Sequence, residues 1–205
     1  MKNLSTKERI LVSAIKMFSK KGYSGASTSE IAKEAGCAEG TIFRYFPKKI
    51  DLLKHVAENF IIEFSSNIAT KLLYRLLEES DDMTPEELVE ALIRDRIMLV
   101  EKKMEILKIV VYEINFHDEV SKMFFDSFKA NVEDIGAELV KVLAKKLDKE
   151  NLDIYMILRT VFGQIAGIIF HFRLMGIVDE KEKMAVMDDM LKTSAQVVIN
   201  GLKAV

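Results

Sequence analysis

The chain has 205 residues, a hydrophobic fraction of 49% and only two prolines, a composition that supports a packed helical core and excludes general disorder. Its single cysteine, Cys37, excludes an internal disulfide and indicates a reducing compartment. The net charge of −2 is unevenly spread, because residues 1–55 carry eleven basic against five acidic side chains while the remainder carries nineteen against twenty-seven. A basic segment on an acidic body is typical of a phosphate-binding module joined to another module.

Apolar residues recur at helical spacing along the whole chain and predict an all-α fold. The first three predicted helices are short and lie within the first quarter of the sequence. Gly22 is expected to end the first helix, Gly36 to form the turn after the second, and Pro47 to stop the third after residues 39–46. Capping boxes mark two of the starts: Ser5 with Glu8, and Ser27 with Glu30.

Longer helices are predicted for the rest of the chain. Four-residue apolar steps predict a helix from about residue 48 to 77, and Thr84-Pro85-Glu86-Glu87 is a strong signal for a new start. Further helices are expected over about 104–114, then from a break at 115–119 to a charged loop at 148–153, and then over 154–174. A last helix carries the apolar repeat Met184, Met187, Leu191, Ala195, Val198 and Leu202.

The segment 154–174 is apolar nearly all the way round, so it needs cover on more than one side. Arg159 and His171 lie within it and would be costly in hydrocarbon, which favours a helix of a soluble protein over a membrane span. Together with the last helix it predicts homodimerisation through the two C-terminal helices. No signal peptide is recognised at the N-terminus, and a cytoplasmic protein is expected.

The third helix divides into two faces. Ile42 and Phe46 lie four residues apart and are expected to face inward, against the first two helices. The other side chains then face outward and suit DNA: a hydroxyl or guanidinium can bind phosphate or a base edge, and a ring can contact a thymine methyl. The predicted DNA-binding residues are Thr28, Glu39, Gly40, Thr41, Phe43, Arg44, Tyr45, Lys48 and Lys49.

The stretch around these residues resembles the DNA-binding region of TetR-type (tetracycline-repressor-like) transcriptional regulators. The matching pattern is Thr28-x-x-Ile31-Ala32, Ala35-Gly36, Gly40-Thr41-Ile42-Phe43, Tyr45-Phe46, Lys49 and Leu52, preceded by Phe18-x-x-x-Gly22-Tyr23. The resemblance covers about the first quarter of the chain. It implies an all-helical homodimer, with a three-helix helix-turn-helix head at 1–48 and a larger effector-binding and dimerisation domain at 49–205.

The resemblance also implies a function. Such regulators bind an operator, expected here as an inverted repeat in double-stranded DNA, and an effector typically releases them. This sequence departs from the usual pattern at Glu39, where a basic residue is frequent. Its carboxylate can accept from cytosine, favour the helix N-terminus, or merely repel phosphate.

By the same resemblance, the effector cavity lies among the middle helices, where adaptable methionine and phenylalanine side chains are frequent. We therefore expect a small hydrophobic effector and no cofactor. Each of these side chains is also a plausible core residue. The predicted ligand-binding residues are Met98, Tyr112, Phe116, Phe128, Arg159, Phe162 and His171.

Two other functions stay open at this point. A helical protein could use its basic head for nonspecific DNA contact, without a small-molecule switch. An all-α enzyme is less well supported, because no nucleophile elbow, glycine-rich phosphate loop or cysteine cluster is present. Glu113 and His117, four residues apart, are weak evidence for a metal site and are also normal for a helix surface.

Overall fold

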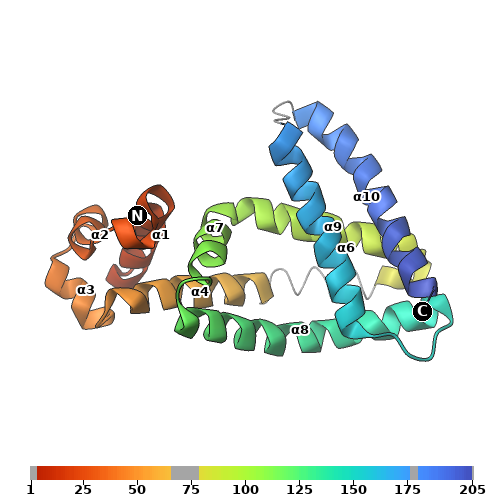
Figure 1. Cartoon of the computed structure of the whole chain (residues 1–205), viewed down its shortest axis with the longest axis horizontal. Helices are drawn as coiled ribbons and strands as arrows, with labels where there is room; N and C mark the ends of the chain where they lie inside the picture. Colours follow the sequence, from red (N-terminus) through yellow and green to blue (C-terminus); the bar gives the residue numbers. More distant parts are fainter. Residues whose placement is uncertain (1–3, 66–78, 176–179, 205) are drawn as a thin grey trace. The chain divides into compact units, whose positions relative to one another are not determined.

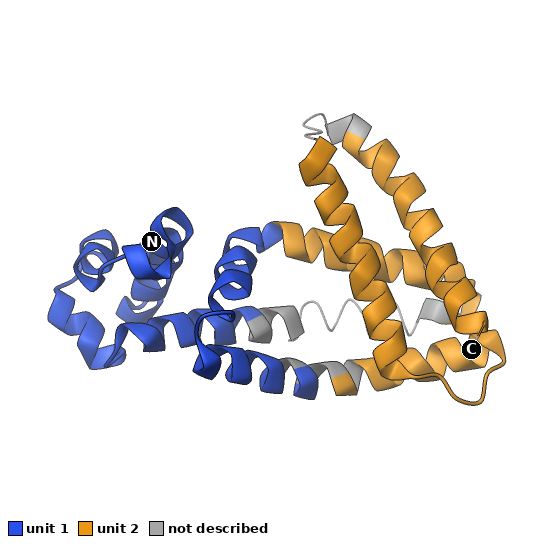
Figure 2. Cartoon of the chain, in the orientation of Figure 1, with its two compact units in different colours: residues 1–66, 102–130 blue, residues 67–101, 131–205 orange. Residues whose placement is uncertain are grey.

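The computed structural model describes residues 4–65, 79–175 and 180–204, and every regular element in these ranges is helical (Figure 1). The all-α prediction is therefore confirmed. The chain divides into two compact units, one formed by Met1–Ser66 with Lys102–Ala130 and the other by Asn67–Glu101 with Asn131–Val205 (Figure 2). The domain boundary at residue 48, which the resemblance implies, stays a prediction. By packing, α4 and α7 belong with the N-terminal helices.

Unit 1 contains short helices at its N-terminal end and segments from the middle of the chain. Its elements are α1 (Thr6–Gly25), α2 (Thr28–Ala35), α3 (Glu39–Tyr45), α4 (Lys49–Ser65), α7 (Met104–Glu113) and the first part of α8 (Asp118–Leu147). The predicted helix at 48–77 matches α4 as far as Ser65, and its remainder lies outside the described residues. Helices α1, α2 and α4 pack around a single apolar core, to which α7 contributes Ile109 and Val110.

Short-range hydrogen bonds define the ends of the first two helices. The hydroxyl of Ser5 accepts from the Glu8 backbone N–H at 3.3 Å, and the Glu8 carboxylate accepts from the Ser5 N–H at 2.7 Å. The second box, Ser27 with Glu30, has the same two bonds at 3.2 Å each, so both predicted capping boxes are confirmed. Gly22 interrupts α1 with a φ of 72°, although a helical turn continues to Gly25, beyond the predicted end.

Unit 2 is built from longer helices. Its elements are the 3-10 turn η1 (Glu79–Asp82), α6 (Pro85–Lys102), the second part of α8, α9 (Ile154–Met175) and α10 (Glu180–Lys203). The predicted restart is confirmed, because Thr84 caps α6: its hydroxyl accepts from the Glu87 N–H at 3.2 Å, and the Glu87 carboxylate accepts from the Thr84 N–H at 2.8 Å. One apolar core joins α6, α8, α9 and α10.

The described residues cover helix α9 on one side only. Ile157, Val161 and Ile165 lie in the core, whereas Phe170 is 62% and Leu174 68% exposed. In the described part of the chain, this helix alone is long and apolar enough to cross a membrane by length and composition, and 22% of its apolar window is buried. The described residues thus leave the second side of α9 uncovered.

The last helix, α10, also has a buried apolar side and exposed apolar residues. Most of the predicted apolar repeat of α10 is buried, including Leu191, Ala195 and Val198. Met184 is the exception, with 65% of its surface exposed. The repeat places it near the start of the helix, beyond the part of α10 that contributes to the core. Like α9, the helix keeps an apolar surface that the part of the chain described by the structure does not cover.

Candidate nucleic-acid interface

A left-handed glycine makes the turn between α2 and α3. Gly36 has φ 64° and ψ 44°, a conformation that side chains disfavour, and its N–H and that of Cys37 bond back to carbonyls of Lys33 and Ala32. This closes α2 tightly and lets the chain enter α3 two residues later. The structure therefore contains the predicted helix-turn-helix, with α3 as its second helix.

The inner face of α3 is fully buried. Ile42 and Phe46 have no exposed surface, and both belong to the core of unit 1. Burying two such side chains contributes about 1.5–3 kcal/mol each, enough to fix the rotation of a helix of seven residues. The predicted orientation of these two residues is confirmed.

That rotation turns the remaining side chains of α3 outward. Phe43 is 44% and Tyr45 39% exposed, and the Arg44 guanidinium lies 5.3 Å from the centroid of the Tyr45 ring. Glu39 is exposed and Thr41 is partly buried. Gly40 is exposed as well, and nothing lies within 4 Å of the position a Cβ would take there. The surface thus combines a cation, rings and a hydroxyl, the groups that contact phosphates and base edges.

Thr28 lies beside this surface, in the first turn of α2. Its hydroxyl donates to the Oε1 atom of Glu39 at 2.5 Å, which links the starts of α2 and α3. The sequence suggested Thr28 as a phosphate donor and did not anticipate this bond. The two residues are eleven apart and belong to different helices, so no local pattern connects them.

The two lysines at the start of α4 differ in their surroundings. Lys48 is exposed, and its backbone N–H donates to the Asp51 carboxylate at 2.8 Å. The Lys49 ammonium donates to the Ser24 carbonyl at 3.4 Å and lies 4.4 Å from the centroid of the Tyr23 ring. Partial burial lowers the pKa of Lys49, and the nearby Glu113 carboxylate opposes that shift.

Glu113 is a buried carboxylate, 4% exposed, that sequence reasoning considered only for a metal site. In the structure it accepts from the backbone N–H of Tyr23 at 3.2 Å and lies 3.4 Å from the Nε2 atom of His117. The His117 ring meets the Tyr23 ring edge-on, with centroids 4.9 Å apart. Among the described residues no group of three potential metal ligands occurs, so Glu113 instead anchors the end of α1 to α7.

Comparison with known proteins agrees with this geometry. Residues 10–56, from α1 to α4, match the family model described as bacterial regulatory proteins, tetR family. This part of the chain therefore resembles the TetR family of regulators. The family model describes regulatory proteins, so the match supports a regulator over the all-α enzyme.

Curated relatives agree with the TetR assignment mainly in the N-terminal half. The chain is 33% identical over 100 residues to the HTH-type transcriptional regulator YvdT of Bacillus subtilis (strain 168), a match that covers 49% of this chain and 48% of that protein. A second relative, a regulator in the lacX 3′ region of Lactococcus lactis subsp. lactis, is 24% identical and matches over 93% of both chains. The chain thus spans about half the length of YvdT in its match.

Solved structures with the same fold extend over nearly the whole chain. A TetR-family regulator from Mesorhizobium loti superimposes with a TM-score of 0.71 over 95% of both chains, at 18% identity. The regulator FadR from Bacillus subtilis, in complex with stearoyl-CoA, gives a TM-score of 0.65 over 92% of this chain and 97% of that one, at 21% identity. These likenesses show that the whole chain has a TetR-type fold.

The predicted ligand-binding residues are divided between the two compact units. Tyr112 and Phe116 belong to unit 1, where their rings lie 5.1 Å apart and are 62% and 65% exposed. The others that are described belong to unit 2: Met98 and Arg159 are exposed, while Phe162 and His171 are partly buried. Phe128 lies outside the residues whose side chains the structure describes.

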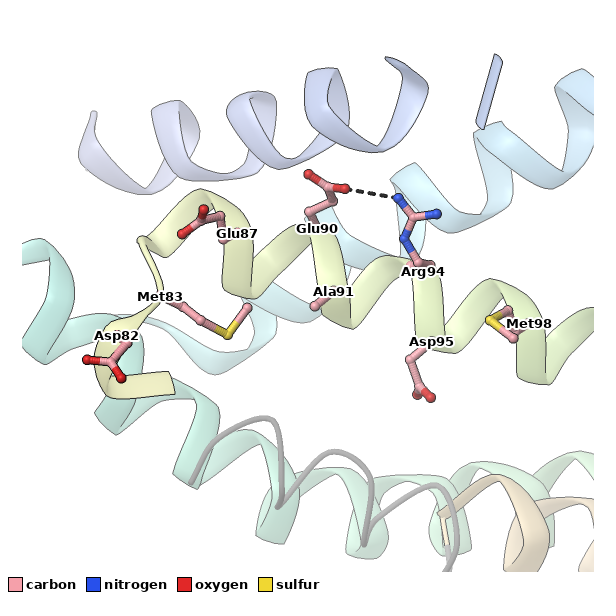
Figure 3. Close-up of a pocket in the computed structure, with 8 residues that line it drawn as sticks. All are labelled: Asp82, Met83, Glu87, Glu90, Ala91, Arg94, Asp95 and Met98. Atoms are coloured by element: carbon pink, nitrogen blue, oxygen red, sulfur yellow. Dashed lines mark hydrogen bonds and ion pairs between the residues drawn. The ribbon is translucent and has the colours of Figure 1, made fainter. Parts of the chain in front are cut away.

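A pocket in unit 2 lies along α6 (Figure 3). Of the predicted ligand residues it includes only Met98. Among the described residues that line it, Arg94 is the one cation, and its side chain pairs with Glu90 at 3.0 Å and with Asp188 at 2.9 Å. The lining residues are Asp82, Met83, Glu87, Glu90, Ala91, Arg94, Asp95 and Met98. Four carboxylates against one guanidinium give the pocket an acidic lining that the sequence did not suggest.

Proposed function

We propose that this chain is a TetR-type DNA-binding transcriptional repressor that a small hydrophobic effector releases from its operator. The observation that carries the DNA-binding half is the orientation of α3. Ile42 and Phe46 are buried, so Phe43, Arg44 and Tyr45 are presented together on the outside. The excess of six positive charges in residues 1–55, the segment that contains α3, also supports binding to a polyanion.

Seven of the nine predicted DNA-binding residues can be given a role on the duplex. Arg44 reads guanine or holds phosphate, and Phe43 contacts a thymine methyl. Thr41, Tyr45, Lys48 and Lys49 bind the phosphate backbone, with Gly40 allowing close approach of α3. Lys49 exchanges its present bond to the Ser24 carbonyl for a phosphate oxygen, since that bond is long, at 3.4 Å.

The active form is proposed to be a homodimer joined through α9 and α10. Support comes from the exposed side of α9, where Phe170 and Leu174 share a face with Gly163 and Gly167. A Cβ at either glycine would have open space around it, so a partner helix could approach closely there. Arg159 is exposed on the same helix, which favours a protein partner over lipid. The protein then acts in the cytoplasm, on an inverted repeat.

The effector is proposed to bind among the middle helices, with the predicted ligand residues as its candidate contacts. FadR from Bacillus subtilis, which shares the fold, was solved with stearoyl-CoA, and this supports a hydrophobic effector here. The acidic lining of the pocket along α6 would repel the phosphates of an acyl-CoA. If the effector uses that pocket, a neutral or cationic hydrophobic molecule suits it better.

Footprinting of the purified full-length protein on genomic DNA tests the proposal. We expect protection of an inverted repeat whose half-sites lie about one helical turn apart, roughly 10 bp, or a multiple of it. A thermal-shift panel of acyl-CoAs, fatty acids and neutral aromatic compounds then identifies molecules that bind, and each is tested for release of the footprint. Equal affinity for every duplex would support the alternative, a helical DNA-binding protein without a small-molecule switch.

A further inference from the structure

Glu39 places a negative charge on the surface that is proposed to meet a polyanion. The other acidic side chains of α1, α2 and α3 are bound to backbone amides or to lysines. Glu8 accepts from the Ser5 N–H, Glu30 pairs with Lys21, and Glu34 pairs with Lys16. The described partner of the Glu39 carboxylate is instead the neutral hydroxyl of Thr28. Its charge is therefore not compensated within the three-helix head.

The hydrogen bond from Thr28 holds one half of this carboxylate. Oε1 accepts the hydroxyl proton at 2.5 Å, and a carboxylate has about four acceptor positions, so Oε2 keeps its full capacity. No described bond joins the carboxylate to a backbone amide of α3, and the residue before it, Ala38, provides no side-chain cap. The carboxylate is thus held at the edge of the recognition surface rather than used to cap α3.

A fixed carboxylate on this surface has opposite effects on different DNA sequences. It repels phosphate wherever the protein sits, which weakens binding to any duplex. It gains a hydrogen bond only where the major groove offers an amino group. Cytosine offers N4–H₂ without an adjacent acceptor, whereas the adenine N6 amino group stands beside the N7 acceptor, which repels a carboxylate. Glu39 therefore favours a cytosine over the other bases.

We propose that Glu39 is a specificity-determining residue that accepts from a cytosine N4 amino group through Oε2, and that Thr28 is the residue that positions it. This inference rests on the proposed DNA-binding function. Of the three roles that the sequence left open for Glu39, capping of the helix N-terminus is dropped. The other two, repulsion of phosphate and selection of cytosine, are effects of the same oriented carboxylate. Thr28 accordingly serves Glu39 and is not itself a phosphate donor.

The test selects preferred sites from a random duplex library with the full-length protein and with Glu39→Gln and Glu39→Ala. Wild type should require cytosine at one position of each half-site. Glutamine pairs with adenine through N6 and N7, so Glu39→Gln should shift that position toward adenine. Glu39→Ala should relax it, with a loss of about tenfold or more on the cytosine site. The alanine variant should also bind random duplex about threefold more tightly, as expected for removing repulsion between charges several ångströms apart in water.

Thr28→Val and Thr28→Ser test the positioning role. Valine keeps the shape but removes the hydroxyl, so the cytosine preference should weaken, and serine should restore it. If Thr28 had only a structural role, Thr28→Val would change the affinity for all sequences equally. The cytosine preference would then be the same in wild type, Thr28→Val and Thr28→Ser.

Two results would overturn the inference. One is that the site preferred by the wild-type protein contains no cytosine whose selection depends on residue 39. The other is that Glu39→Ala changes the affinity for every duplex by the same factor. Absence of any duplex binding by wild type is a different result, and it would overturn the regulator proposal itself.

Discussion

Helices α3 and α9 both expose aromatic rings, but the residues around those rings differ. On α3 the exposed Phe43 and Tyr45 flank Arg44, whose guanidinium lies over the Tyr45 ring. On α9 the exposed Phe170 shares its face with glycines and apolar side chains. Rings beside cations suit a polyanion, whereas rings beside small apolar residues suit another helix. Exposed aromatic area thus has to be interpreted from its neighbours.

The largest expected effect is the difference between removing a buried ring and removing an exposed ring from α3. Phe46→Ala should lower the free energy of unfolding of unit 1 by about 3–5 kcal/mol, because the ring has no exposed surface and its loss leaves a cavity. Phe43→Ala should change it by no more than about 0.5 kcal/mol and instead weaken DNA binding. Urea unfolding followed by circular dichroism measures both. Equal destabilisation would contradict the orientation of α3.

On α9, a charge placed on the exposed face should separate the proposed dimer. Phe170→Glu should weaken self-association at least ~100-fold, since a buried phenylalanine contributes about 1.5–3 kcal/mol and a symmetric interface contains it twice. Sedimentation equilibrium measures the effect. Phe125→Glu is the matched control, because Phe125 is 55% exposed on α8 and lies in unit 1. Unchanged association of Phe170→Glu would exclude this face as the interface.

A smaller effect is expected in the salt dependence of DNA affinity, which shows whether Lys49 at the start of α4 contacts phosphate. Lys49→Ala should weaken binding to all duplexes alike and reduce the slope of log affinity against log salt by about 0.9, the value for one phosphate contact. Lys141→Ala is the control, because Lys141 pairs with Glu138 at 2.6 Å on α8, in unit 2. An unchanged slope would mean that Lys49 keeps its bond to Ser24 on DNA.

The smallest effect concerns the cap of α2. The Lys21 ammonium, with the amide and hydroxyl of Ser27, lowers the pKa of the Glu30 carboxyl from 4.5 to about 2. A lowered pKa in the folded state stabilises above the unfolded value, so this contribution is present above pH 4.5 and is lost as the pH falls toward about 2. As the pH falls over that range, the midpoint temperature of thermal unfolding should therefore decline less steeply for Glu30→Gln than for wild type. Lys21→Ala should raise the pKa of Glu30, which carboxyl NMR titration measures.

Local patterns predicted much of the DNA-binding head. Both capping boxes, the Gly36 turn and the two faces of α3 could be read from the sequence, because each depends on hydrogen bonds or side-chain spacing within a few residues. The TetR-type pattern added the family and the expectation of DNA binding. The helix ends agreed to within a few residues for the same reason.

Contacts between distant residues could not be predicted in this way. The bond from Thr28 to Glu39 joins two helices, and the bond from Tyr23 to Glu113 spans 90 residues. Tyr112 belongs to one unit and Phe162 to the other because of how the helices pack. The apolar periodicity along a helix does not show which other helices it packs against. Short-range bonds and apolar spacing are enough to predict which helices form and which face of α3 is buried. Which side chains meet depends on how separate helices fill a shared core, so it follows only from the folded structure.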